Sequence, residues 1–272
     1  MKQTVAGLLI ERYPPEKPKF RSSVLLVHGL WATGECWQTW ATHFSNLGWD
    51  CRAVNLPGRI QDTSLTTLLD LNLDLAVEEL ARVVNSFSPS PVVVTHGVGA
   101  LVALKAAEKA TFAALVLASP VPPRNAGIPR SRALKLLRLK YLPLMFLRRP
   151  FRIEEKDLRK TFLAPLPETL QTEISRKIIP ESNQLVQELF QTHVDIEPGR
   201  IGCPCLVLAG GQDQLIPTAS SHDIARWLGA DFKEYPGQGH WIIEANSEPI
   251  VRDIHRWLVQ NLGDRVLIAE LS

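Results

Sequence analysis

Cysteine is scarce in this sequence, because the chain of 272 residues contains only four. Cys203 and Cys205 are separated by one residue, whereas zinc sites use a C-x₂-C spacing, and a disulfide scaffold needs a denser set. We therefore expect free thiols in a reducing compartment. The first apolar stretch is broken at Glu11, too early for a signal peptide, and no run of about 18 apolar residues could cross a membrane. These absences predict a cytoplasmic protein.

Clusters of metal-ligating residues and nucleotide-binding motifs are also missing. Histidines, cysteines and carboxylates do not recur at the spacing of a metal site, and no glycine-rich dinucleotide motif occurs. We therefore expect neither a metal nor an organic cofactor. The sequence contains no nucleic-acid recognition motif, so we do not expect a nucleic-acid partner.

Charge is unevenly distributed along the chain, although the net charge is only +2. Residues 124–160 contain twelve Lys or Arg and three Asp or Glu, which gives this segment a net charge of +9 and leaves −7 for the rest. Such a segment forms either a solvated outer face or a contact for an anionic group, such as a phosphopantetheine carrier or a lipid headgroup.

Apolar runs of strand length alternate with segments of helical periodicity. The expected strands cover residues 4–10, 23–27, 50–56, a run that starts at 92, 113–118, 205–209 and 232–235. The expected helices cover residues 37–47, 72–87, 101–107, 220–228 and 248–262. Continuous apolar strands joined by helices predict an α/β fold, with a mostly parallel sheet that is covered on both faces.

One interval breaks this alternation, between residues 119 and 205. It contains helical patterns at 130–141, 154–162, 167–178 and 182–192, and no convincing strand. The interval is too long for a crossover between neighbouring strands. We therefore predict a core formed by residues 1–120 and 203–272, with a helical cap inserted at residues 121–202.

A sharp turn joins the β-branched run at residues 92–95 to an apolar helix. Strand, turn and helix in this order are the context of the nucleophile elbow, G-x-S-x-G. Alignment of that pattern places Thr95 at the first glycine, Gly97 at the nucleophile and Gly99 at the last glycine. The residue at the tip of the turn therefore has no side chain.

Segments on both sides of this turn make nearly the whole chain resemble the α/β-hydrolase superfamily, in its capped, serine-hydrolase-like form. The matching segments are the His-Gly turn at 25–31, an N-x-P-G segment at 55–58 in place of D-x-P-G, the elbow at 92–100, the loop at 206–217 and the loop at 235–241. Each motif alone is weak, but their common order predicts the fold.

The resemblance implies a role for several residues of these segments. Asp213 would orient His240, and His240 would act as the base that points at the elbow. The backbone N–H groups of Leu30 and Val98 would form an oxyanion hole. Trp31, next to the first of these amides, would contact the substrate.

Gly97 excludes covalent catalysis at the elbow. Loss of the nucleophile from a working triad lowers kcat on the order of 10⁶-fold. Thr95, Cys36, Ser119 or a water molecule could replace it, but none of these side chains has the spacing of a known triad. Glycine tolerates a strained turn best, so its presence does not indicate a damaged fold.

Three hypotheses remain open. In the first, Asp213 and His240 act as a general-base pair on a small ester, thioester or lactone-like compound, without a covalent intermediate. In the second, the chain is a non-catalytic pseudo-hydrolase that binds a ligand or partner. In the third, it is an ordinary serine ester hydrolase that carries a Ser-to-Gly substitution at position 97.

Overall fold

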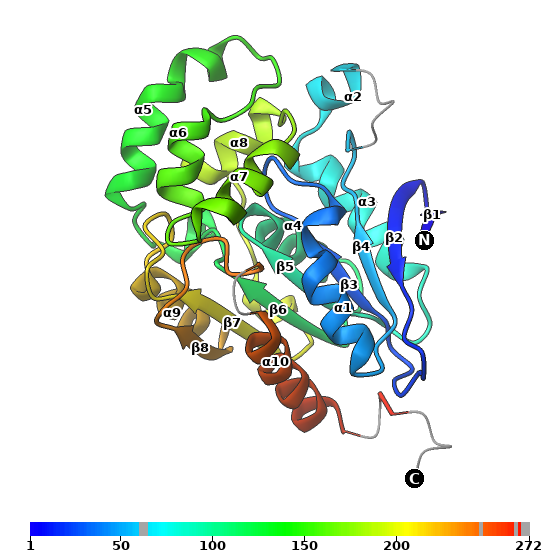
Figure 1. Cartoon of the computed structure of the whole chain (residues 1–272). Helices are drawn as coiled ribbons and strands as arrows, with labels where there is room; N and C mark the ends of the chain where they lie inside the picture. The colour runs from blue at the N-terminus through cyan, green and yellow to red at the C-terminus, as the bar shows by residue number, and fades with distance from the viewer. Residues whose placement is uncertain (60–64, 245–246, 264–265, 268–272) are drawn as a thin grey trace.

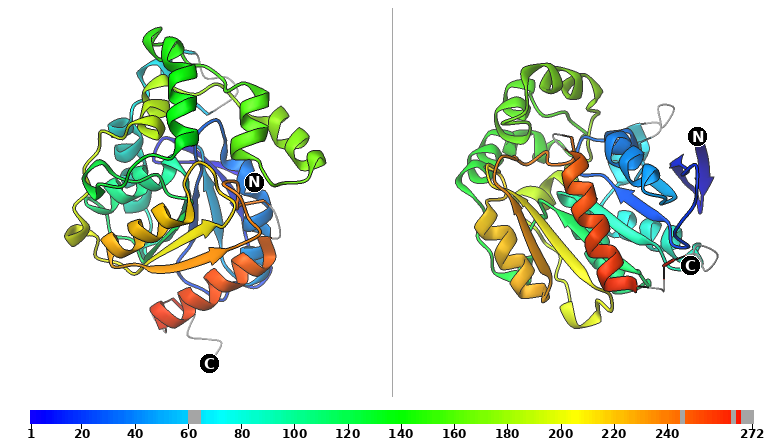
Figure 2. Two further views of the ribbon diagram at one scale, coloured as in Figure 1. Left: turned by 90° about the vertical axis from the view of Figure 1, so that its left-hand side faces the viewer. Right: turned by 60° about the horizontal axis from the view of Figure 1, so that its bottom comes forward.

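An eight-stranded sheet forms the centre of the molecule, and helices pack on both of its faces (Figures 1 and 2). This computed structural model describes residues 1–59, 65–244, 247–263 and 266–267. The strands are β1 Lys2–Val5, β2 Leu8–Tyr13, β3 Val24–Val27, β4 Cys51–Val54, β5 Val92–His96, β6 Ala114–Ala118, β7 Cys205–Gly210 and β8 Asp231–Tyr235. Their order is β1-β2-β4-β3-β5-β6-β7-β8, and only β1 and β2 run antiparallel to their neighbours. The predicted α/β fold class is confirmed.

The helices of the core cover the sheet in two layers. Their bounds are α1 Gln38–Asn46, α2 Leu65–Asp70, α3 Leu73–Asn85, α4 Val98–Ala107, α9 Thr218–Leu228 and α10 Ser247–Leu262, with the 3₁₀ turn η1 Gly34–Trp37. Two further 3₁₀ turns, η2 Arg124–Ala126 and η4 Pro198–Arg200, lie between β6 and β7. Helices α1 and α10 pack together on one face, and α3 and α4 pack together on the other (Figure 1). Strands β3, β5 and β6 at the sheet centre are buried along their whole length. The sequences of β3 and β6 are entirely apolar, as burial on both faces requires, and β5 is apolar up to Thr95.

The connections reverse direction at β3, which lies between β4 and β5. The chain leaves β3 for the strand on one side, β4, and later returns to the strand on the other side, β5. In open α/β sheets, ligands bind outside the carboxyl ends of the strands at such a switch point. The register pairs Val27 with Thr95, so the turns that follow these two strands lie next to each other.

A group of helices fills the interval between β6 and β7. They are α5 Arg132–Phe146, α6 Glu155–Asp157, the π-helix η3 Leu158–Phe162, α7 Glu168–Lys177 and α8 Asn183–Phe190. Residues 119–204 are all described and contain no strand, only an isolated bridge between Phe151 and Glu181. The helices of this interval, which we call the insertion, gather beyond the carboxyl ends of the strands, at the top of Figure 1.

Two expected elements differ from the structure. The strand expected at residues 4–10 is a hairpin, because Ala6 and Gly7 both have positive φ angles, 47° and 92°, and form a tight turn between β1 and β2. The helix expected to end at residue 141 continues through Pro143 to Phe146. Pro143 is exposed, so the backbone hydrogen bond that it cannot donate is lost where water can replace it.

The remaining differences concern the middle of the chain. The helix expected at 154–162 is divided into α6 and the π-helix η3, and α2 was not expected at all.

None of the described helices is long and apolar enough to cross a membrane. All four cysteines are free.

Candidate active site

The turn after β5 is built on Gly97. Its φ and ψ angles are 57° and −121°, a conformation that glycine adopts without strain, and α4 begins at the next residue, Val98. The Gly97 N–H donates to the carbonyl of Ala118 at 3.0 Å, and the Gly97 carbonyl accepts from the N–H of Val121 at 3.3 Å. Strand β6 and the residues after it therefore hold the tip of the turn in place.

Two further glycines allow the turns after β3 and β5 to approach closely. A Cβ atom on Gly99 would lie 2.5 Å from the carbonyl oxygen of His28. A Cβ atom on Gly29 would lie 3.0 Å from Nδ1 of His96. The first turn of α4 therefore rests directly on the His-Gly turn. Only glycine fits at position 99, and a side chain at position 29 would be tightly packed.

This contact places two backbone amides at the switch point of the sheet. Val98 is the first residue of α4, and amides in the first turn of a helix have no acceptor inside the helix. The N–H of Leu30 has no acceptor within the described part of the chain. Both residues are buried. These are the two donors that the resemblance assigns to an oxyanion hole.

Asp213 and His240 meet next to the elbow. Asp213 Oδ2 lies 2.8 Å from His240 Nδ1, and both side chains are almost fully buried. The second carboxylate oxygen, Oδ1, accepts the N–H groups of Leu215 at 2.8 Å and Ile216 at 2.9 Å, which fixes its orientation. A Cβ atom built on Gly97 would lie 3.7 Å from His240 Nε2. Among the described residues outside the segment around Gly97, no other atom would lie within 4 Å of that Cβ. The imidazole therefore presents Nε2 to the position that a nucleophile would occupy.

Two other buried histidines support these loops. The His28 ring accepts the N–H of Leu56 at Nε2 (3.2 Å) and donates from Nδ1 to the Gly29 carbonyl (2.8 Å). The ring of His96 donates from Nε2 to the backbone carbonyl of His240 at 2.9 Å. Burial lowers the pKa of both His28 and His96 to about 3, so both are neutral near pH 7. They position the turns and carry no charge into the site.

The inserted π-helix η3 lies against the histidine loop. The ring of Phe162 packs edge-on to the ring of His240, with 5.4 Å between the ring centroids. The backbone carbonyl of Phe162 accepts the N–H of Trp241 at 3.2 Å. A Cβ atom on Gly239 would collide with the carbonyl of Ala164. The loop that carries the histidine is therefore enclosed between the sheet and the insertion. π-Helical turns are frequent at functional sites.

A buried ion pair between core and insertion has no signal in the sequence. Glu181, from the insertion, accepts the N–H of Trp31 at 3.0 Å and pairs with Arg59 at 2.5 Å, and both charged side chains are fully buried. Trp31 has a φ angle of 57°, which is unusual for a bulky residue, and its indole donates to the carbonyl of Phe151 at 3.2 Å. The amide of Trp31, the residue after Leu30, is therefore engaged by Glu181.

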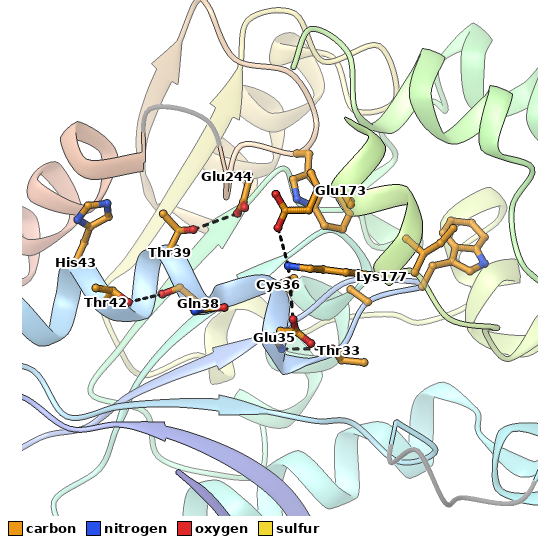
Figure 3. A pocket seen from close by; sticks show the side chains of 15 residues that line it. Thr33, Glu35, Cys36, Gln38, Thr39, Thr42, His43, Glu173, Lys177 and Glu244 are labelled. Carbon is orange, nitrogen blue, oxygen red and sulfur yellow. Dashed lines mark hydrogen bonds and ion pairs between the residues drawn. The ribbon is translucent and has the colours of Figure 1, made fainter. Parts of the chain in front are cut away.

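A pocket of about 480 Å³ opens beside these residues (Figure 3). Trp31 and Trp241, the residues that follow Leu30 and His240, are part of its lining. Its carboxylate and ammonium groups belong to Glu35, Glu173, Glu244 and Lys177. Lys177 pairs with Glu173 at 2.9 Å and with Glu35 at 3.5 Å, and so joins α7 to η1 across the pocket (Figure 3). Burial raises the pKa of Glu244.

The three side chains considered as replacements for the nucleophile, Cys36, Thr95 and Ser119, are engaged or placed elsewhere in the described structure. Cys36 lines the pocket beside Trp31, and burial raises the pKa of its thiol well above the usual value. Thr95 donates to the carbonyl of Val116 inside the sheet, and buried Ser119 has no hydrogen-bond partner among the described residues. None of the three forms a hydrogen bond with His240 in the part of the chain that the structure describes. Nor do the described residues include a group of three or more His, Cys, Asp or Glu placed to hold a metal ion.

Comparison with known proteins identifies the family and supports the fold. A sequence model described as the alpha/beta hydrolase family matches residues 24–253. An esterase from Exiguobacterium antarcticum is similar in structure, with a TM-score of 0.70 and 17% identity over 94% of this chain and 98% of that chain. A thermophilic esterase from Thermogutta terrifontis has a TM-score of 0.68 and 19% identity over 96% and 98%. A monoacylglycerol lipase from Paleococcus ferrophilus has a TM-score of 0.69 and 19% identity over 93% and 99%. A search of curated protein sequences found no match.

Proposed function

The chain belongs to the α/β hydrolase family, and from this premise we propose that it is a hydrolase-type enzyme for a small carbonyl compound, such as an ester, thioester or lactone. Asp213 and His240 act as the general-base pair, and the amides of Leu30 and Val98 bind the developing oxyanion. No covalent intermediate forms at Gly97, because glycine has no nucleophilic atom.

The position of His240 Nε2, 3.7 Å from the site of a Cβ on Gly97, is the observation that carries this proposal. A water molecule at that site would give its proton to Nε2 while its oxygen attacks the carbonyl carbon. The charge on the carbonyl oxygen is then stabilised by the two amides, and the imidazolium by Asp213. When the tetrahedral intermediate collapses, Nε2 returns the proton to the leaving oxygen or sulfur.

Residues 121–202 act in this proposal as a cap over the site, since η3 lies against the histidine loop. The neighbouring pocket of about 480 Å³ holds the remainder of the substrate against Trp31. Three carboxylates and one lysine in its lining disfavour a substrate with an anionic tail. The basic segment at 124–160 instead faces an anionic partner outside the site.

A second candidate function is that of a serine ester hydrolase in which glycine has replaced serine at position 97. The same geometry favours it, because a side chain added at Gly97 would meet only the ring of His240 among the described residues outside its own chain segment. The sequence of the natural gene at codon 97 distinguishes the two candidates. A serine codon there would support the second.

The proposed function is tested by turnover of a panel of esters, thioesters and lactones with the unaltered chain. His240→Ala and Asp213→Asn are each expected to lower kcat/KM about 10²- to 10⁴-fold. His222→Ala is the control, because this exposed histidine packs on Phe232 of β8. Turnover that is unchanged by His240→Ala would contradict the proposal. Ligand binding without any turnover would instead support a pseudo-hydrolase.

A further inference from the structure

Helix α5 has two apolar stripes on opposite sides. The inward stripe is spaced three and four residues apart and is at most 6% exposed, at Leu134, Leu137, Tyr141 and Met145. The outward stripe has the same spacing, at Leu136, Leu139, Pro143 and Phe146. The inward stripe accounts for the packing of α5 on the rest of the insertion, including α8. The outward stripe has no such role in the folded chain.

The outward side chains are unusually exposed. Phe146 is 78% exposed, Leu139 70% and Leu147 63%. Eight large apolar side chains in the described residues are at least 37% exposed, and five of these lie between residues 136 and 147. Single exposed apolar residues are normal on a protein surface, but a contiguous group marks an interaction site.

Basic side chains surround this stripe. They are Arg132, Lys135, Arg138, Arg148 and Arg149, all exposed or nearly so, and none pairs with a carboxylate in the described part of the chain. The sequence of α5 itself contains no acidic residue. Lys140 differs from them, because it is paired with Glu154 at 2.5 Å and Asp157 at 2.7 Å. We call these five basic residues, together with the outward stripe and Leu147, the outer face of α5.

We propose that the outer face of α5 docks on an anionic lipid bilayer. Helices with leucine and phenylalanine on one side and Lys or Arg around them lie in the interface between headgroups and acyl chains. The basic side chains are attracted to the negative surface potential, and the apolar side chains enter below the headgroups. Helix α5 lies at the outer edge of the insertion, away from the sheet, so a flat surface can reach it (Figures 1 and 2).

Other occupants fit the outer face less well. A symmetric dimer through this face would bring five positive charges against five positive charges. A soluble acidic carrier would match the charges, but its polar surface would leave the side chains of Leu139 and Phe146 without an apolar contact. This inference rests only on the part of the proposed function that places an anionic partner at the basic segment, and not on the chemistry at His240.

The test measures co-sedimentation of the full chain with phosphatidylcholine vesicles, with and without phosphatidylglycerol. We expect binding to the anionic vesicles only, and loss of binding as salt is raised. Two variants, Leu139→Ser/Phe146→Ser and Arg148→Glu/Arg149→Glu, should each lower the partition coefficient at least about tenfold. The matched control is Arg252→Glu/Arg256→Glu on α10, which changes the net charge equally at the other end of the molecule (Figure 1).

Each outcome decides the inference. Failure of the unaltered chain to bind anionic vesicles overturns it, as does an equal loss from the α10 control. A loss from the arginine variant with none from the serine variant also overturns it, because the apolar side chains then do not enter the bilayer. His240→Ala should bind vesicles as the unaltered chain does, so failure of the catalytic proposal leaves this result untouched. Circular dichroism verifies that each variant is folded.

Discussion

The carboxyl edge of the sheet buries charged side chains, whereas the outer face of α5 exposes apolar ones. At the sheet edge, charged groups are buried and each has a partner, as in Asp213 with His240 and Glu181 with Arg59. On α5, leucine and phenylalanine side chains are left in water among basic residues without a partner in the described chain. Both arrangements cost stability, and proteins retain such costs at functional sites. Buried, paired charges are suited to a catalytic site that excludes water, and exposed apolar side chains among basic residues are suited to a binding surface.

The largest effect on stability is expected from the buried ion pair that joins core and insertion. Glu181→Ala leaves Arg59 buried without its partner, which should lower the free energy of unfolding by about 3–5 kcal/mol. The control is Glu154→Ala, which removes an exposed partner of Lys140 and should cost less than about 1 kcal/mol. Urea unfolding followed by fluorescence measures both. Equal losses from the two variants would remove the distinction between buried and exposed pairs.

Two adjacent leucines of α5 sharpen the comparison within one helix. Leu137→Ala removes a side chain of the inward stripe and should cost about 2–5 kcal/mol. Leu136→Ala, one residue earlier and 58% exposed, should change stability by less than about 0.5 kcal/mol. The same urea titration gives both values. A large loss from Leu136→Ala would show that the outer face is packed in the folded chain and is not free to bind a partner.

Stability is also expected to depend on pH. His28 and His96 have pKa values lowered to about 3 by burial, against about 6.5 in an unfolded chain. Between these values the unfolded chain binds protons that the folded chain does not. The free energy of unfolding should therefore fall as pH decreases from about 6.5 towards 3, by about 1.4 kcal/mol per pH unit for each histidine. Above about pH 6.5 neither histidine contributes to the slope.

Replacement of one of these histidines isolates its share of the pH dependence. His96→Gln keeps a polar side chain that does not titrate, so its stability should fall less steeply between pH 6 and pH 4 than that of the unaltered chain. Parallel stability curves for the two proteins would mean that His96 is not held neutral in the folded state.

Much of the fold follows from local patterns in the sequence. The unbroken apolar runs at β3, β5 and β6 predict buried parallel strands, and the glycines at 97 and 99 predict a tight turn before α4. The hairpin between β1 and β2 escaped prediction because it depends on Ala6 in a left-handed conformation that alanine rarely adopts. The continuation of α5 past Pro143 depends on Met145 packing inside the insertion, which local propensity does not report.

The site was predictable where it depends on motifs, and not where it depends on long-range pairing. Asp213 and His240 lie in recognisable loops, and the structure brings them within 2.8 Å of each other. Arg59 and Glu181 are 122 positions apart in the sequence, and no motif around either residue predicts that they pair. The pocket in Figure 3 likewise forms only when α7 of the insertion meets η1 of the core.

We propose that a general base and two amide donors are assembled around position 97, and Gly97→Ser tests this central claim most directly. Gly97→Ala is the matched control, because both side chains impose the same backbone strain at φ 57° and only serine adds a hydroxyl. The measurements are covalent labelling by a fluorophosphonate probe and hydrolysis of a small ester. We predict that folded Gly97→Ser is labelled and hydrolyses the ester on the order of 10²-fold faster or more than Gly97→Ala, which is not labelled. A folded Gly97→Ser protein that is neither labelled nor active would contradict the claim.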